Sequence, residues 1–169
     1  MSKLIYVPGS GPLKAHTDYM FVGEAPGAKE EELGKSFVGP SGKLLDKWIK
    51  EGLQLKREQV YVTNIVKVRP QDNRTPTSEE IASWLPILKR EIEDVNPLYI
   101  ITVGTTATQA ILGVKKTNGD ILYNEEFDLN VMSIYHPSFI MRQRSKNTEV
   151  IEALKNLKQI RDDWYEGRE

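Results

Sequence analysis

Polar groups able to do chemistry on a ligand come directly after three predicted strands of this chain. The segment Gly23–Gly27 (Gly-Glu-Ala-Pro-Gly) follows the first strand, Asn64 ends the second, and His136 follows the last. Ligands of open parallel sheets bind beyond the carboxyl ends of the strands, so the Glu24 carboxylate, the amide and the imidazole should meet at one rim. Each residue alone is a weak indication, because asparagine commonly caps turns and a single histidine is more often structural. Three such groups in register favour a ligand site.

Basic residues lie in the loops that follow two of these strands. They are Lys67, Arg69 and Arg74 after the second strand, and Arg142, Arg144 and Lys146 after the last. Such side chains can simply face solvent, but around a pocket they would bind phosphate groups. The loops therefore favour an anionic ligand of the nucleic-acid type.

Apolar residues in the same loops fit either a nucleic-acid ligand or ordinary core. Phe139-Ile140-Met141 follows Ser138 and, if exposed beside arginines, resembles the wedges that part stacked bases. Phe37 lies in a loop, where its ring could stack on a base or close the core. The sequence leaves both interpretations open.

The elements that must position these residues are predicted from apolar runs and helical spacing. Buried strands are expected at 19–22, 60–66, 98–103 and 131–134, and helices at about 41–53, 81–95, 104–112 and 148–164. Residues 23–42 are expected to form a loop, with Ser41 capping the helix after it, and residues 113–130 to hold a small hairpin. Strands alternating with helices favour a three-layer α/β/α sandwich with a central, mostly parallel sheet of about four strands. The length favours a single domain over residues 1–169.

Composition excludes several classes of site. The chain has no cysteine, which excludes disulfides, thiolate zinc sites, iron–sulfur clusters and a cysteine nucleophile, and it has only two histidines. The net charge of -1 argues against a strongly basic coat but allows local basic patches. We find no membrane-spanning segment or signal peptide. We therefore expect no metal, no cofactor, no membrane association and a cytoplasmic protein.

Five ordered blocks of sequence resemble a known family when taken together. They are Gly23-Glu24-Ala25-Pro26-Gly27-Ala28, Ser36-Phe37-Val38-Gly39 with Gly42-Lys43-Leu44-Leu45-Asp46, Val60–Lys67, Arg69-Pro70 with Asn73-Arg74-Thr75-Pro76, and Tyr135-His136-Pro137-Ser138. The chain resembles the uracil-DNA glycosylase superfamily from about Tyr19 to Arg144, most closely family 4, the branch that usually carries an iron–sulfur cluster. Any one block is weak, but five in order are specific.

The resemblance implies hydrolysis of the N-glycosidic bond of uracil in single- or double-stranded DNA, after the base is flipped into a pocket. It implies catalytic roles for Glu24 and His136 and uracil contacts from Ala25, Phe37 and Asn64. The DNA-binding set would be Lys67, Arg69, Arg74, Ser138, Phe139, Ile140, Met141, Arg142 and Arg144. An amide such as that of Asn64 matches the O4 acceptor and N3–H donor of uracil, provided that packing prevents the amide from turning over. We expect a monomer with no partner other than DNA.

Two departures from the family pattern matter. Cluster-bearing relatives have cysteines at the positions of Val68 and Trp84, and the short N-terminal segment has no counterpart for the other two. Apolar packing of Val68 and Trp84 is our hypothesis for what replaces the cluster. The family 1 enzymes have an aspartate where this chain has Ala25 and a tyrosine where it has Gly27. Glu24 is therefore the nearest carboxylate to the attacking water, and nothing at Gly27 blocks a 5-methyl group.

Other functions remain open from the sequence alone. The same fold could remove hypoxanthine, xanthine or a 5-hydroxymethylated pyrimidine. The chain could also be a non-catalytic DNA-binding or replication-associated module, although the joint presence of Glu24, Asn64 and His136 counts against a decayed site. A small-molecule nucleotide-binding protein is disfavoured by the lack of a P-loop and of a Gly-x-Gly-x-x-Gly pattern.

Overall fold

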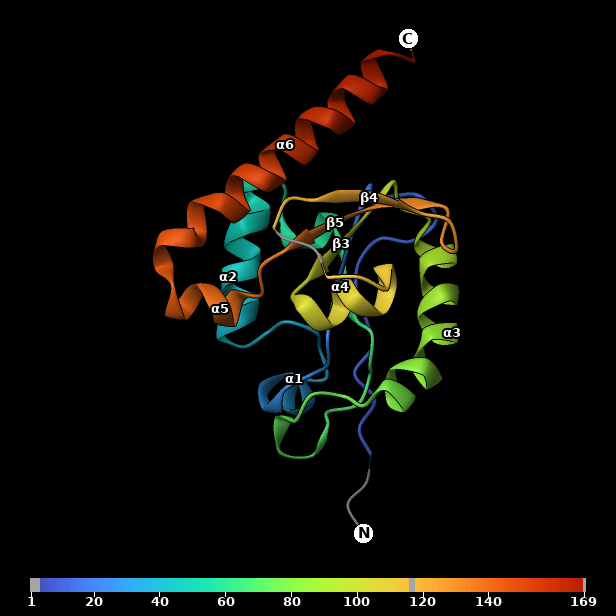
Figure 1. The fold of residues 1–169 in the computed structure, drawn as a ribbon, viewed down its shortest axis with the longest axis vertical. Helices are drawn as coiled ribbons and strands as arrows, with labels where there is room; N and C mark the ends of the chain where they lie inside the picture. Colours follow the sequence, from blue (N-terminus) through green and yellow to red (C-terminus); the bar gives the residue numbers. More distant parts are fainter. Residues whose placement is uncertain (1–3, 116–117, 169) are drawn as a thin grey trace.

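A central twisted sheet organises the computed structural model of this chain, which describes residues 4–115 and 118–168 (Figure 1). The described residues form a five-stranded sheet in the order β2-β1-β3-β5-β4. Its strands are β1 (Tyr19–Gly23), β2 (Tyr61–Asn64), β3 (Tyr99–Val103), β4 (Ile121–Asn124) and β5 (Leu129–Ile134). Strands β2, β1, β3 and β5 run parallel, and β4 pairs antiparallel with β5.

Helices cover both faces of this sheet. The helices of the fold are α1 (Ala28–Leu33), α2 (Pro40–Trp48), α3 (Ser78–Val95), α4 (Thr105–Leu112), α5 (Pro137–Arg142) and α6 (Asn147–Glu166), and all of them except α1 contribute buried residues to the two cores beside the sheet. The side chains of β1 alternate between the faces: Tyr19 and Phe21 pack with α2, α5 and α6, whereas Met20 and Val22 pack with α3 and α4. Both faces of a parallel strand are buried in this way, which explains its continuous apolar run. The three-layer α/β/α prediction is confirmed, with one strand more than expected.

The extra strand comes from the segment predicted to hold a hairpin. Strand β4 pairs with β5, which begins at Leu129 and not at Val131, so the second arm of the hairpin is the predicted fourth strand itself. The turn closes at Asp128, whose φ of 52° lies in the left-handed region that Asp tolerates better than most residues. The hairpin adds an antiparallel edge to an otherwise parallel sheet.

The segment predicted to be a loop, 23–42, contains helix α1 and the start of α2. Helix α1 has no buried residue, so it lacks the apolar periodicity by which a helix is recognised in a sequence. Helix α2 is capped by Gly39, with Pro40 in its first turn, and the prediction of Ser41 as the cap is therefore wrong. Its last turn continues as a π-helical turn, Ile49–Leu53.

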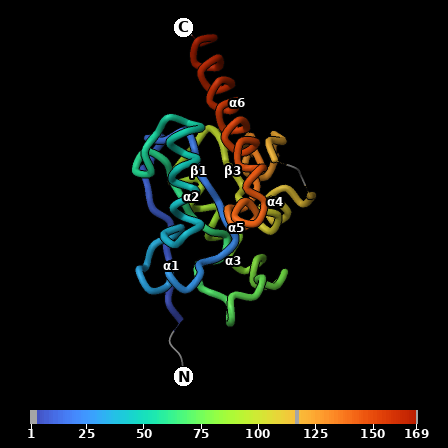
Figure 2. Tube along the Cα trace, turned by 90° about the vertical axis from the view of Figure 1, so that its left-hand side faces the viewer, coloured from blue at the N-terminus to red at the C-terminus, as the bar shows by residue number. Residues whose placement is uncertain are grey.

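Helix α6 projects beyond the rest of the fold at its C-terminal end (Figure 2). Its first half packs over α2 and the π-helical turn through Val150, Leu154 and Leu157. No helix in the described ranges is both long enough and apolar enough to cross a membrane.

Candidate active site

The carboxyl ends of the parallel strands bring the predicted polar groups together. Gly23 pairs with Asn64 in the β1–β2 ladder, and Val103 pairs with Ile134 in the β3–β5 ladder. Beyond these ends lies a cavity of about 460 Å³. It is lined by Glu24, Ala25, Pro26, Gly27, Glu30, Phe37, Ser41, Asn64, Asn73, His136 and Ser138. All five residues predicted to bind or cleave the base therefore line one cavity.

Phe37 and Asn64 lie against each other across Gly23. A Cβ atom at position 23 would lie 2.4 Å from Phe37 Cζ and 2.5 Å from Asn64 Oδ1, so only glycine allows both side chains to approach the end of β1. Both side chains are buried. In the described part of the chain no group hydrogen-bonds the Asn64 side-chain amide, which leaves it available to a ligand in the cavity.

Arg57 and Gly42 determine the backbone conformation at Phe37. Phe37 has a φ of 54°, in the left-handed region, which is costly for a large side chain. Arg57 donates from Nη1 to the Phe37 carbonyl at 2.9 Å and from Nη2 to the Ser36 carbonyl, and the same Nη1 lies 2.8 Å from Asp46 Oδ1. A Cβ atom at Gly42 would lie 1.9 Å from the Phe37 carbonyl oxygen, so glycine is required where α2 passes this loop. The aromatic ring is thus held over the cavity.

His136 begins helix α5, and this position fixes its protonation. Its Nδ1 accepts a hydrogen bond from the Ser138 backbone N–H at 3.0 Å and lies 2.8 Å from Ser138 Oγ. An Nδ1 that accepts cannot carry a proton, so the ring is neutral and its proton is on Nε2. Burial of the ring, with the nearby positive charge of Arg142, lowers the pKa of His136 below its ordinary value. His136 is therefore a neutral hydrogen-bond donor, and its ring centroid lies 6.5 Å from that of Phe37.

Glu30 is a site residue that the sequence analysis missed. Its Oε1 accepts from the Gly27 N–H at 3.1 Å, and its Oε2 accepts from the N–H groups of Val38 and Gly39 at 2.9 and 2.8 Å. Burial raises the pKa of this carboxyl, but the backbone donors of Gly39 and Val38 outweigh burial and hold the pKa below its ordinary value. The carboxylate thus joins the first loop of the cavity to the loop that carries Phe37. The sequence pattern that could have revealed Glu30 is Gly27 followed three residues later by a glutamate, which resembles the pattern at the start of many helices.

A smaller cavity of about 180 Å³ adjoins the first one. Residues Glu24, His136 and Ser138 line both cavities, and Gly104, Thr105 and Thr106 at the start of α4 complete the smaller one. The sequence analysis placed no site residue after β3, although Gly-Thr-Thr follows that strand as directly as the polar groups follow the others.

Two of the predicted DNA-binding residues lie inside the protein, and those predictions are corrected here. The Lys67 side chain is fully buried, with its ammonium 2.7 Å from Glu91 Oε1, so it cannot reach a phosphate. Ile140 is buried in the core because α5, predicted to be a loop, turns that position towards α2. In both cases the residue type matched the surface role but the fold placed the side chain inside.

The other predicted DNA-binding residues lie at the surface or partly so. Phe139 packs on the Tyr135 ring with centroids 4.7 Å apart, and Met141 is exposed. The exposed Arg142 and Arg144 lie at the end of α5 and in the turn that follows it. Arg69 donates to Asn73, and Arg74 forms an exposed ion pair with Glu80. The roles of these residues stay predictions.

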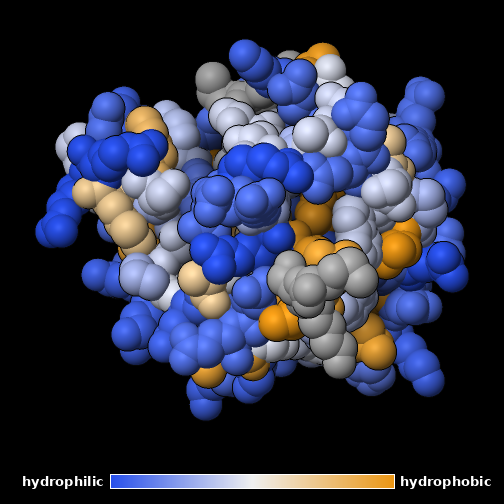
Figure 3. Space-filling view, turned by 90° about the horizontal axis from the view of Figure 1, so that it is seen from below, coloured by the Kyte–Doolittle hydropathy of each residue, from blue (hydrophilic) through white to orange (hydrophobic). Residues whose placement is uncertain are grey.

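The residues at the former cluster positions do not fit an iron–sulfur cluster. Such a cluster requires thiolates, and the chain has none. Val68 and Trp84, both partly buried, line a groove of about 660 Å³ with Leu4 and Ile5, and the Tyr6 ring packs on Trp84 with centroids 6.1 Å apart. Figure 3 shows hydrophobic surface on this lower, N-terminal face of the molecule. Charged residues, among them Glu31, Arg69 and Glu80, line the same groove, so apolar packing does not fill it.

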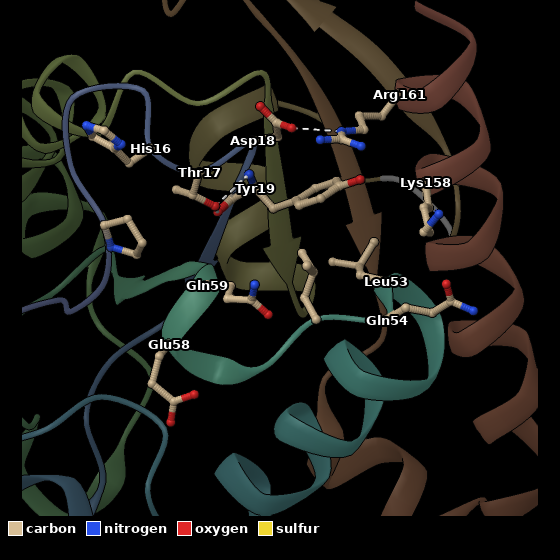
Figure 4. A pocket seen from close by; sticks show the side chains of 12 residues that line it. His16, Thr17, Asp18, Tyr19, Leu53, Gln54, Glu58, Gln59, Lys158 and Arg161 are labelled. Carbon is tan, nitrogen blue, oxygen red and sulfur yellow. Dashed lines mark hydrogen bonds and ion pairs between the residues drawn. The ribbon is translucent and has the colours of Figure 1, made fainter. Parts of the chain in front are cut away.

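A second pocket, of about 410 Å³, lies at the opposite, amino ends of β1 and β2 (Figure 4). Its charged groups are largely paired with each other, since Arg161 binds Asp18 at 2.7 Å and Lys158 binds Asp162 at 2.8 Å. The Tyr19 hydroxyl is buried there without a hydrogen-bond partner among the described residues. This pocket contains none of the predicted site residues and is not the candidate active site.

Comparisons with known proteins give the family to which the chain is similar. The model of the "Uracil DNA glycosylase superfamily" matches residues 8–158 of the chain. The "Type-4 uracil-DNA glycosylase" of Sulfurisphaera tokodaii is 37% identical over 164 residues, which cover 91% of this chain and 74% of the relative. The proteins of the same name from Archaeoglobus fulgidus and Thermotoga maritima are 34% and 37% identical, and the matches cover 94% and 90% of this chain and 83% and 81% of those relatives.

Proposed function

The chain belongs to the uracil-DNA glycosylase superfamily, and we propose that the cavity beyond β1, β2 and β5 is where it hydrolyses the N-glycosidic bond of uracil in DNA. The observation that carries the proposal is the convergence of an unengaged amide, an aromatic ring and a neutral imidazole donor on one cavity, beside Glu24. A base inside a duplex cannot reach such a cavity, so the nucleotide must leave the stack at a cost of a few kcal/mol.

Recognition of the base is assigned to Asn64 and Phe37. The Asn64 amide can donate from its NH₂ to uracil O4 and accept from N3–H at its carbonyl oxygen. Cytosine presents the reverse pattern, so it would place donor against donor and acceptor against acceptor. The Phe37 ring lies beside the amide and would stack on the base. Ala25, in the first loop, would contact the other edge of the base through its backbone.

Stabilisation of the leaving base is assigned to His136. As the glycosidic bond stretches, negative charge grows on uracil, mainly at O2, and the neutral ring donates to it from Nε2. The ring need not lose or gain a proton for this, because the Ser138 N–H keeps Nδ1 as an acceptor. Glu24 lies on the wall shared by both cavities, where its carboxylate can orient the attacking water or oppose positive charge on the sugar.

Contacts with the DNA backbone are assigned to the exposed residues of the loops. Arg142, whose charge acts on His136, and the exposed Arg144 would bind phosphates, and Met141 and Phe139 are the remaining candidates for the inserted wedge. Ser138, Arg69 and Arg74 complete the proposed DNA-binding set. A single sheet with one layer of helices on each face supports one domain over residues 1–169. We infer a monomer that acts in the cytoplasm.

The test is release of the base from labelled oligonucleotides that carry uracil in single-stranded form, opposite guanine or opposite adenine, followed by alkaline cleavage of abasic sites. We expect cleavage of all three uracil substrates. Parallel substrates with hypoxanthine, xanthine and 5-hydroxymethyluracil test the alternative bases, of which the last is favoured by Gly27, which has no side chain of its own to block a 5-substituent. If the protein binds these oligonucleotides but releases no base, the proposed enzymatic function is refuted and a DNA-binding module is the remaining interpretation.

A further inference from the structure

We propose that Lys67, buried beneath the cavity, is a positioning residue that holds Asn64 in place for base recognition, a role that rests on the function proposed above. Lys67 does not line the cavity and cannot touch the substrate. It acts through the backbone of the residue that does.

The ammonium group of Lys67 contacts the end of β2 directly. It donates to the Asn64 backbone carbonyl and, at 2.7 Å, to Thr63 Oγ1. A third bond, also 2.7 Å, reaches Glu91 Oε1 in α3. The three donors of the ammonium are thus engaged with the last two residues of the strand and with the helix that covers it.

The Asn64 carbonyl lies at the end of an outer strand of the sheet. Strand β1 pairs with one side of β2, Ser10 forms an isolated bridge with Val62 on the other side, and the chain leaves the sheet after Asn64. The next two residues, Ile65 and Val66, donate their N–H groups to the carbonyls of Gly23 and Glu24 in the first loop of the cavity. Besides Lys67, the Thr63 hydroxyl lies 3.4 Å from the Asn64 carbonyl oxygen, but it also lies 3.1 Å from Glu91 Oε1 and has a single proton, so without the ammonium the peptide plane would be held less firmly.

The Glu91 carboxylate, in α3, also binds two other side chains of β2 and so restrains the network from the side of the helix. Glu91 Oε2 accepts from the Tyr61 hydroxyl at 2.7 Å, and Glu91 Oε1 also accepts from Thr63 Oγ1 at 3.1 Å. The lysine, the carboxylate, the phenol and the threonine therefore satisfy one another within the protein.

Stability alone is a poor reason for this arrangement. Replacing a buried ion pair by apolar residues of similar volume is often neutral or stabilising, because desolvation of the two charges offsets their attraction. What an apolar pair could not do is donate to the Asn64 carbonyl. We therefore assign the network to the placement of Asn64, whose amide must keep one orientation to distinguish uracil from cytosine.

The test compares Lys67→Met with the double variant Lys67→Met/Glu91→Gln. The single variant leaves a buried carboxylate without its cation and is expected to lose stability. The double variant removes both charges, and the amide that replaces the Glu91 carboxylate can still bond the Tyr61 hydroxyl, so we expect its melting temperature to return towards that of the wild type. Lys89→Met, an exposed lysine on the same helix, is the matched control and should leave stability and activity unchanged.

The rate of uracil release distinguishes a positioning role of Lys67 from a purely structural role. We expect the double variant to release uracil with a kcat about 10- to 100-fold below wild type, since displacement of a binding group by about 1 Å can cost on the order of 10²-fold. Its KM should be unchanged, because the phosphate contacts lie elsewhere. A double variant that recovers both the melting temperature and the wild-type kcat would refute the positioning role.

A readout that does not depend on catalysis keeps this proposal separate from the proposed function. In the ¹⁵N-labelled protein, the backbone and side-chain amide signals of Asn64 should shift or broaden in the double variant and not in Lys89→Met. Unchanged Asn64 signals overturn the proposal even if the variant is slow. If the wild-type protein releases no base, the proposed function fails, and the Asn64 signals still decide whether Lys67 positions this residue.

Discussion

Replacing His136 by asparagine should separate its structural role from its proposed catalytic one. Asparagine is among the best N-cap residues, so its Oδ1 can accept from the Ser138 N–H in place of Nδ1 and preserve the start of α5. The shorter amide cannot reach where Nε2 presents its proton. Alanine at the same position removes both the cap and the donor.

The expected magnitudes follow from these two contacts. Loss of one well-placed donor to a developing oxyanion costs roughly 3–4 kcal/mol, or about 10²–10³ in kcat, so both variants should lose that factor. Loss of an N-cap costs about 0.5–2 kcal/mol, so only His136→Ala should also lose stability by this amount. We therefore expect His136→Asn and His136→Ala to have the same kcat but different melting temperatures.

The pH dependence tests whether the neutral ring is the active form. Burial, with the nearby Arg142, places the pKa of His136 below its ordinary 6.5, and Nδ1 can take a proton only if it gives up the Ser138 bond. The wild-type kcat should therefore stay level as pH falls through 6.5 and decline only below the lowered pKa. A kcat that rises as pH falls through 6.5 would mean that the imidazolium is the donor, and a fully active His136→Asn would show that the ring is not the donor to the base.

The free energy of unfolding should also depend on the protonation of His136 in this pH range. Between the lowered pKa in the folded state and 6.5 in the unfolded state, the unfolded chain binds more protons, so the free energy of unfolding rises with pH across this window. Stability from the neutral ring is therefore lost as pH falls below 6.5. Denaturant titrations of the wild type and of His136→Asn at several pH values should show this component in the wild type only.

Three further predictions concern recognition, DNA binding and the core. Asn64→Asp should lower kcat about 10- to 100-fold, because a carboxylate offers no donor to uracil O4 and an unsatisfied buried polar group costs about 1–3 kcal/mol. Single-turnover release of uracil measures this effect. An unaffected rate would mean that the base binds elsewhere. Replacing Arg142 and Arg144 by alanine should weaken binding equally for uracil-containing and normal DNA and reduce the slope of log K against log salt by about 0.9 for each lost phosphate contact, whereas an unchanged slope would exclude both residues from the interface. Tyr19→Phe removes a buried hydroxyl that has no hydrogen-bond partner among the described residues. We expect this variant to be more stable by about 1 kcal/mol, or roughly 2–4 °C in melting temperature. A loss of stability would mean that water or a ligand binds the hydroxyl.

The parallel sheet explains why the sequence was sufficient to locate the cavity. Strands that are buried on both faces have continuous apolar runs, so their ends can be recognised, and parallel pairing places those ends at one edge. Glu24, Asn64 and His136 were therefore brought together by strand register alone. No knowledge of helix packing was needed for that step.

Side-chain burial was harder to predict, because it depends on contacts between distant segments. Lys67 follows Asn64 by three residues and has the type of a phosphate-binding residue, but its partner Glu91 is on α3, 24 positions later. Nothing local distinguishes it from the exposed Arg74. Ile140 was misplaced for a related reason, since a six-residue helix whose buried residues are Pro137 and Ile140 is too short to show a periodic pattern.

The residues that were missed or misassigned from the sequence share one physical feature: they bind backbone groups and not the proposed ligand. Glu30 accepts from the N–H groups of two loops, Arg57 donates to the carbonyls around Phe37, and Lys67 donates to the carbonyl of Asn64. Backbone groups are the same at every position, so neither residue type nor spacing indicates where such a bond will form. A charged side chain that satisfies a buried backbone group also fixes the peptide plane, and thus the direction of the side chain on it. Phe37 and Asn64, the residues proposed to bind the base, depend on such bonds for their orientation, and so base discrimination in this protein should be sensitive to substitutions that never touch the base.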